Sequence, residues 1–298
     1  MTPIERILCP VDFSEFSRHA LDYAVAIARP QQARVTALHV VPPAQTMYPV
    51  FGALAHVPYV YTAEDLKEFH KTLERFVADA GYPISAVSVE ALVVDEILKR
   101  AAEMPADLIV MGTHGRSGFD RLLLGSVTQR VIAKAPSPVL TVPHGAPGFG
   151  SVTTRLFRNV LCPVDFSPSS LAALTYAQEL AGESGARLTV LHVVEPLPAF
   201  QLVPAIATGA PDDPLVILEH ARARVQSVVP ARVRRVTKVN ELVSEGHAGD
   251  EILNVAHAGN TDLIVMGAHA GHAGLLGFGS TTNRVIRAAS CPVVTLRG

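Results

Sequence analysis

ILCPVDFS at residues 7–14 recurs as VLCPVDFS at residues 160–167, and this repetition decides how the chain is built. Four further blocks recur in the same order: LHVV at 38–41 and 191–194, DEIL at 95–98 and 250–253, DLIVMG at 107–112 and 262–267, and RVI at 130–132 and 284–286. Their offsets stay between 153 and 155 residues, which indicates an internal duplication. We therefore expect a domain at 1–144, a linker rich in Gly and Pro at 145–157, and a second domain at 158–298.

Within each copy, short apolar runs alternate with amphipathic segments. In the first copy the runs at 7–11, 34–41, 87–92, 108–111 and 139–142 predict strands, and helices are expected at about 17–29, 63–80, 95–103 and 126–135. Ser14 or Ser17 is expected to cap the first helix, and the Pro-rich stretch 42–61 is expected to be a loop. The alternation predicts an α/β fold in which helices cover both faces of a parallel sheet.

Composition narrows the classes of partner. The net charge is -2 and the pI is near 6.6, so no global field favours nucleic acid or an anionic membrane, and neither is expected as a partner. The arginines between Arg222 and Arg235 are expected to form a solvated face. Cys9 and Cys162 lie inside apolar strands as core thiols, which favours a reducing, cytoplasmic setting.

A glycine-containing loop follows the fourth strand and reads MGTHGRSGFDRLLLGS at residues 111–126. Gly112 and Gly115 are expected to turn backbone amides towards an anion by adopting positive φ. Gly125 and Ser126 open a helix whose first amides are unpaired and whose dipole favours phosphate. A lone pair of glycines indicates only a turn, but the full pattern between a strand and a helix predicts a phosphate site.

The pattern G-x2-G-x9-G-[S/T] resembles the ATP-binding signature of the universal stress protein family, and the likeness extends to both halves of the chain. The resemblance implies two tandem flavodoxin-like domains, each a five-stranded parallel sheet of order 3-2-1-4-5. It also implies ATP across the strand ends, with Mg²⁺ or Mn²⁺ on its phosphates. The residues that it places around the nucleotide are Asp12, Val40, Met111, Gly112, His114, Gly115, Gly125, Ser126, Val127 and Thr128. Asp12 is equally suited to cap the first helix, so both roles stay open.

The second copy departs from this pattern. Ala270 replaces the second glycine, and eight residues rather than nine precede Gly279. Gly271 and Gly274 offer an alternative turn in a shifted register, which would restore the phosphate contacts. The corresponding second-site residues are Asp165, Val193, Gly267, His269, Gly279 and Ser280.

Three function classes fit these observations. A nucleotide-binding regulatory module, compatible with slow ATP hydrolysis, is favoured. An adenine-nucleotide hydrolase or adenylating enzyme is disfavoured because no lysine lies in either glycine loop and no glycine follows the first strand. A nucleotide-free structural partner fits the second half better than the first. We expect no catalytic residue and no metal-ligand cluster, and we expect His39 and His192 to be structural.

The final strands of the two copies are apolar and lie at a sheet edge in the family's order. The resemblance therefore also implies an internal pseudo-dimer of the two domains, and it is compatible with a homodimer.

Overall fold

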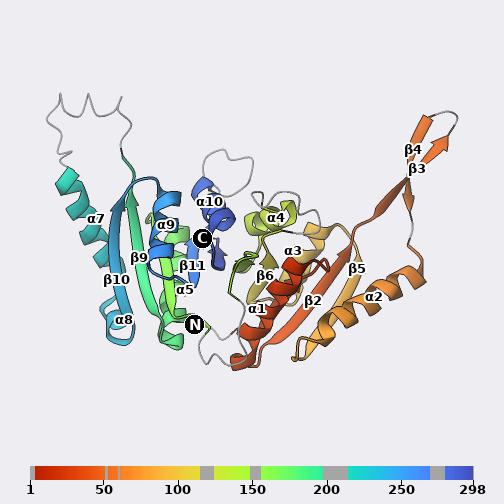
Figure 1. Cartoon of the computed structure of the whole chain (residues 1–298), viewed down its shortest axis with the longest axis horizontal. Coiled ribbons are helices and arrows are strands. Elements are labelled where there is room, and N and C mark those ends of the chain that lie inside the picture. Colours follow the sequence, from red (N-terminus) through yellow and green to blue (C-terminus); the bar gives the residue numbers. More distant parts are fainter. Residues whose placement is uncertain are drawn as a thin grey trace. The chain divides into compact units, whose positions relative to one another are not determined.

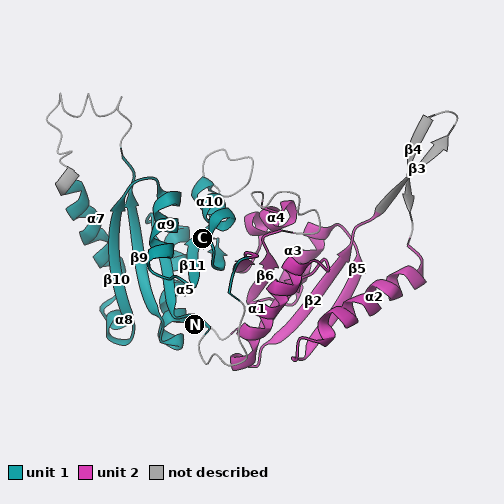
Figure 2. Ribbon diagram, viewed as in Figure 1, with its two compact units in different colours: residues 1, 145–298 teal, residues 2–144 magenta. Residues whose placement is uncertain are grey.

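The computed structural model of the chain describes residues 4–50, 53–59, 61–114, 124–147, 156–196, 214–268 and 279–297. The chain divides into two compact units, which we call the N-terminal unit (Thr2–His144) and the C-terminal unit (Gly145–Gly298). Figure 2 shows them in magenta and teal, respectively. The two units share the succession of five parallel strands with connecting helices that the duplication predicts (Figure 1). Beyond this shared plan, the described residues form a hairpin at 44–59 in the N-terminal unit and a short helix at 231–236 in the C-terminal unit.

The N-terminal unit holds a parallel sheet of order β5-β2-β1-β6-β7, which is the expected 3-2-1-4-5 order. Helix α1 packs on β6 and β1, α2 packs on β5, and α3 packs against α4. The elements are β1 (Arg6–Pro10), α1 (Glu15–Gln31), β2 (Arg34–Val41), β3 (Ala44–Val50), β4 (Ala53–Tyr59), α2 (Ala63–Ala78), β5 (Ile84–Glu90), α3 (Val93–Glu103), β6 (Leu108–Gly112), α4 (Ser126–Lys134) and β7 (Val139–Val142).

The C-terminal unit repeats the arrangement as a sheet of order β10-β9-β8-β11-β12. Its elements are β8 (Asn159–Pro163), α5 (Pro168–Ser184), β9 (Arg187–Val194), α7 (Pro214–Val228), α8 (Ala231–Val236), β10 (Lys238–Glu245), α9 (Ala248–Ala258), β11 (Leu263–Gly267), α10 (Ser280–Ala288) and β12 (Val293–Leu296). In the part of the chain that the structure describes, every helix is too short or too polar to cross a bilayer.

The central strands are buried because helices cover both faces of each sheet. Ile7, Leu8 and Cys9 of β1 are completely shielded from solvent, and Leu8 is paired with Thr36 of β2 on one side and Ile109 of β6 on the other. Burial raises the pKa of the Cys9 thiol far above its usual range, so the thiol stays neutral and unreactive. These apolar strands form the rigid base from which the loops of the site project.

The stretch expected to be a Pro-rich loop contains an antiparallel hairpin instead. Strands β3 and β4 pair with one another and form a separate two-stranded sheet, visible at the far right of Figure 1. Pro49 and Pro58 are tolerated there because both strands of a two-stranded sheet are edge strands. The expectation of a loop is wrong because Thr46, Tyr48 and Val57 favour strands, and a proline at an edge does not prevent them.

Candidate nucleotide site at the carboxyl ends of the strands

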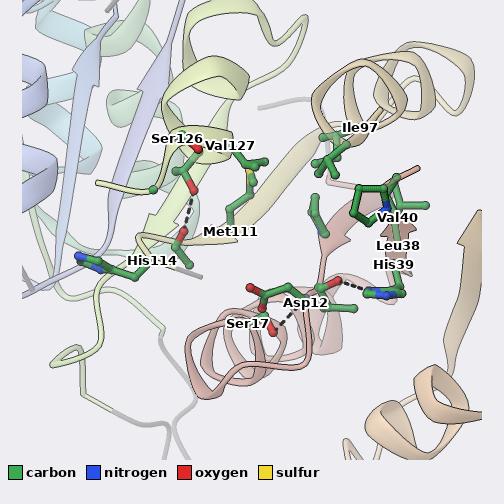
Figure 3. Close-up of a pocket in the computed structure, with 17 residues that line it drawn as sticks. Asp12, Ser17, Leu38, His39, Val40, Ile97, Met111, His114, Ser126 and Val127 are labelled. Carbon is green, nitrogen blue, oxygen red and sulfur yellow. Dashed lines mark hydrogen bonds between the residues drawn. The ribbon is translucent and has the colours of Figure 1, made fainter. Parts of the chain in front are cut away.

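A cavity of about 370 Å³ lies where β1, β2 and β6 end in the N-terminal unit (Figure 3). The chain order of the sheet reverses between β1 and β6, and open α/β sheets bind ligands at this kind of switch point. The turn after β1, the end of β2, helix α3 and the first turn of α4 supply the rest of the wall. The volume falls in the range of small-molecule sites, about 300–1,000 Å³.

The turn after β1 positions Asp12 at the mouth of helix α1. Ser14 is the N-cap, since its hydroxyl oxygen accepts a hydrogen bond from the Ser17 amide at 3.2 Å. Asp12 accepts hydrogen bonds from the amide and the hydroxyl of Ser14, and its own amide donates to the Ser17 hydroxyl. Asp12 therefore orients the cap, and the expectation that its carboxylate caps the helix is wrong. The carboxylate is held in place beside the cavity.

His39 ties the end of β2 to the end of β1. Its Nδ1 lies 2.8 Å from the carbonyl oxygen of Val11, which can only accept, so Nδ1 carries the proton. Phe13 has a positive φ of 66° and places its ring 4.1 Å from the imidazole. The expected structural role of His39 is thus visible in its contacts, although the residue also lines the cavity. Together with Leu38, Val40 and Pro42, it makes one apolar wall.

Gly112 is required by packing rather than by positive φ. A Cβ atom there would lie 3.0 Å from the Phe16 carbonyl oxygen and 3.1 Å from its carbonyl carbon, because α1 crosses β6 closely at this point. The residue ends a strand, and its backbone is outside the left-handed region. Gly125 also has a negative φ of -57°. The expectation that positive φ at Gly112 turns amides towards a ligand is therefore wrong, and Gly115 lies outside the described residues.

Helix α4 begins at the cavity with an uncapped first turn. Gly125 is its N-cap and supplies no side-chain hydrogen bond, while the Gly125 amide donates to the Thr113 carbonyl at 2.9 Å. The amides that follow, at Ser126 and Val127, are left for ligand or solvent. Thr128 fastens the turn to the strand, since its hydroxyl donates to the Gly112 carbonyl at 3.0 Å. An uncapped helix N-terminus of this kind has the geometry and the dipole that favour an anion.

His114 lines the cavity, but Figure 3 shows its imidazole pointing away from the other labelled residues. The Nδ1 atom lies 2.9 Å from the Thr113 hydroxyl, and the ring packs against Phe16 with 5.4 Å between centroids. Burial, and secondarily the nearby His144, lower the pKa of His114 below its ordinary value. The ring is therefore neutral at pH 7.

The structure brings together the residues that the sequence placed at the site, as far as they are described. Those that line the cavity are Asp12, Val40, Met111, Gly112, His114, Gly125, Ser126, Val127 and Thr128. Sequence reasoning missed Pro10, Val11, Ser17, Leu38, His39, Pro42, Val93 and Ile97. Most of these adjoin the ends of predicted strands, which was a usable signal. Val93 and Ile97 of α3 had none, because tertiary packing alone brings α3 to the cavity. Among the residues described here, no three His, Cys, Asp or Glu side chains gather as a metal site.

The C-terminal unit keeps the framework of this site. The Asp165 carboxylate accepts hydrogen bonds from Ser167, and the Thr282 hydroxyl donates to the Gly267 carbonyl at 3.1 Å. Gly279 is the uncapped N-cap of α10, which starts at Ser280. Val193 lies near the end of β9, whereas His269 lies outside the described residues.

The C-terminal unit differs in charge at the end of its second strand. The sequence HVVPP at 39–43 corresponds to HVVEP at 192–196, so Glu195 replaces the cavity residue Pro42. The Glu195 carboxylate accepts a hydrogen bond from the Ala248 amide, 3.2 Å away, at the start of α9. A negative charge thus occupies a position that is neutral and apolar in the N-terminal unit.

Each unit is a Rossmann-like α/β domain, and the N-terminal unit has a cavity at its topological switch point. The family model of the universal stress proteins matches residues 3–143 and again residues 156–297. The chain therefore belongs to the universal stress protein family, as a tandem of two such domains.

Similar proteins show both the single and the tandem arrangement. A universal stress protein of Mycolicibacterium smegmatis is 27% identical over 296 residues, covering 98% of this chain and 96% of that protein. One from Methanocaldococcus jannaschii is 37% identical over 142 residues, covering 46% of this chain and 81% of that protein. The crystal structure of a universal stress protein from Archaeoglobus fulgidus superposes with a TM-score of 0.66 at 24% identity, covering 98% and 96% of the two chains. This last likeness confirms the fold.

Proposed function

We propose that the N-terminal unit binds an adenine nucleotide, ATP, in the cavity at the ends of β1, β2 and β6, and that the chain acts as a nucleotide-dependent regulatory module. The observation that carries the proposal is the convergence of every described residue of the predicted site on one cavity. Those residues come from three strand ends and one helix, and no periodicity in the sequence requires them to meet.

The two ends of the cavity suit the two ends of such a ligand. The uncapped first turn of α4, at Ser126 and Val127, suits the phosphates because its amides and dipole favour negative charge. The apolar wall at Leu38 and Val40 suits a purine ring, and Asp12 lies between them with acceptor oxygens for a ribose hydroxyl. A nucleotide bound here would bring Mg²⁺ or Mn²⁺ on its phosphates.

A regulatory role is favoured over fast catalysis. The described wall of the cavity contains no lysine or arginine that could neutralise charge developing on a transferring phosphoryl group. Its titratable groups are Asp12, His39 and His114. Asp12 is engaged by Ser14, His39 donates to a carbonyl group, and the His114 ring points away from the other labelled residues of the cavity wall. This set is compatible with slow hydrolysis at most.

The proposal assigns the stronger site to the N-terminal unit and a weaker or empty one to the C-terminal unit. Ala270 and the shortened loop remove backbone contacts that a phosphate needs. Glu195 adds a negative charge that repels an anionic ligand where the N-terminal unit has Pro42. Both differences lower the affinity of the second copy for a nucleotide.

Thermal unfolding of the full chain with ATP and Mg²⁺ tests the proposal. A ligand that binds only the native state adds about 2.7 kcal/mol at 100 times its dissociation constant. For domains of this size that corresponds to a rise of roughly 5–11 °C in the melting temperature. CTP with Mg²⁺ controls for non-specific binding of a triphosphate. An unchanged melting temperature in millimolar ATP, or an equal rise with CTP, would contradict adenine-nucleotide binding.

A further inference from the structure

A second cavity lies in the C-terminal unit, at the amino-terminal ends of β8, β9 and β10. The carboxyl ends of these strands, where a nucleotide site is expected, lie at the other side of the sheet. The volume of this second cavity is about 690 Å³. Arg158 immediately precedes β8, Arg187 starts β9 and Lys238 starts β10, and all three line this cavity. The strands are parallel neighbours in which Arg187 is paired with Asn159 on one side and with Lys238 on the other. Because neighbouring strands lie about 4.8 Å apart, the three cations follow the sheet edge over about 10 Å.

The positive charge of this cavity is not balanced by its own wall. Among the described residues, none of the three cations forms an ion pair, and no carboxylate lines the cavity. The nearest acid, Asp262, accepts hydrogen bonds from the backbone amides of Arg158 and Asn159 at 2.8 and 3.1 Å. By contrast, Arg234 of the neighbouring helix α8 is paired with Glu241. Asp262 also interacts electrostatically with Arg158. Among the described residues, Arg187 and Lys238 are therefore the cavity cations without a counterion, and together they favour the binding of an anion.

The N-terminal unit provides an internal comparison, because a tyrosine stands there two residues before the start of β5. There the Tyr82 hydroxyl donates to the Ala33 carbonyl at 2.7 Å, beside Arg34 at the start of β2. The repeat aligns Tyr82 with Thr237, whose hydroxyl is buried without a hydrogen-bond partner. The C-terminal unit therefore lacks this tyrosine ring beside Ala186, the counterpart of Ala33, and Ala186 lines the open cavity.

The same alignment shows a change of charge. Arg34 corresponds to Arg187, but Glu5 corresponds to Arg158 and Pro83 to Lys238. Arg6 corresponds to Asn159, which also lines the cavity, so one positive charge is lost as well. Over these four aligned positions the formal charge rises from +1 in the N-terminal copy to +3 in the C-terminal copy, while the sheet itself is the same. These changes are not needed to build the fold, because the N-terminal copy builds it without them.

We propose that this cavity binds a small polyanion bearing two or three phosphate groups, independently of the nucleotide site. Arginine guanidinium groups bind phosphate oxygens in pairs, and lysine adds a point charge. Three cations spread along about 10 Å match a short chain of phosphates better than a single one. The binding depends on ionic strength, since all three side chains are exposed.

Isothermal titration of the full chain with inorganic tripolyphosphate, at low and at physiological ionic strength, tests this inference. The double variant Arg187→Gln/Lys238→Gln is expected to weaken binding at least tenfold. Arg34→Gln removes the equivalent exposed cation of the other copy and is the matched control, expected to leave binding unchanged. Higher salt is expected to weaken the wild-type interaction.

A third variant tests whether the polyanion binds inside the cavity or is attracted only by the positive charge of the surface. Val236 lines the cavity and is 73% exposed, so Val236→Trp keeps all three cations and is expected to weaken binding by filling the cavity. Circular dichroism checks each fold, and the glutamine variants decide the outcome if the tryptophan is not accommodated. Absence of binding, an equal loss in Arg34→Gln, or loss of the signal in Gly125→Val rather than in the glutamine variants would each overturn the proposal.

Discussion

Replacing Gly112 by alanine tests whether packing requires a glycine at this position of the predicted phosphate loop. The added Cβ would lie 3.0 Å from the Phe16 carbonyl oxygen, which belongs to the backbone of α1 and cannot rotate away. Overpacking of this kind costs about 1–3 kcal/mol. At Gly125 the nearest atom is the Thr113 carbonyl oxygen at 3.4 Å, and the φ of -57° suits any residue. Gly125→Ala is therefore expected to leave the stability unchanged or slightly raised.

Thermal and urea unfolding of the two variants without nucleotide measure the difference. Gly112→Ala is expected to melt roughly 2–12 °C below the wild type, since 1 kcal/mol corresponds to about 2–4 °C for a domain of this size. Gly267→Ala in the other unit is expected to cost more, because its Cβ would lie 2.7 Å from backbone atoms of Ser169 and Ser170. If Gly112→Ala proved as stable as Gly125→Ala, the strand-end glycine would not be a packing residue, and the reasoning would be refuted.

Three further predictions concern pH, capping and association. The pKa of His114 is lowered in the folded chain, so the unfolded chain takes up the proton first as the pH drops. The free energy of unfolding is therefore expected to fall from about pH 7 down through the folded pKa. In urea titrations His114→Gln is expected to flatten this pH dependence, and an unaltered slope would refute the prediction. Ser14→Ala removes the cap of α1 and is expected to cost about 1 kcal/mol in unfolding free energy, as is Ser167→Ala for α5; a loss below a few tenths would contradict the capping role. Each half expressed alone is expected to form homodimers in sedimentation experiments, because β7 and β12 end their sheets as apolar edges, and strictly monomeric halves at high micromolar concentration would count against an internal pseudo-dimer.

The central strands could be predicted from the sequence because burial on both faces leaves a continuous apolar run, as in Leu108–Gly112. Because the sequence repeats, the parallel strands and helices expected in the first half could also be expected, in the same order, in the second half. The hairpin Ala44–Tyr59 could not be predicted in the same way, because its two strands pair with each other and do not belong to the parallel sheet whose continuous apolar runs were the signal.

The candidate site was predictable where it lies on motifs next to strand ends, as for Asp12 and Ser126. It was not predictable where it depends on tertiary packing, as for Ile97 of α3. The reason for Gly112 was also hidden, since only the structure shows how closely α1 approaches β6. The sequence shows that Glu195 replaces Pro42. Its effect on ligand affinity could not be predicted, because only the structure shows that Pro42 lines the cavity.

The two units are predicted to differ in their affinity for a nucleotide, and titration calorimetry of the full chain with ATP and Mg²⁺ measures this difference. Each lost amide contact to a charged phosphate costs about 1.5–3 kcal/mol, which is at least a tenfold loss of affinity. We predict one tight site per chain that Gly125→Val abolishes and the matched variant Gly279→Val leaves nearly unchanged. Two equivalent tight sites, or a single site removed by Gly279→Val and not by Gly125→Val, would contradict the account.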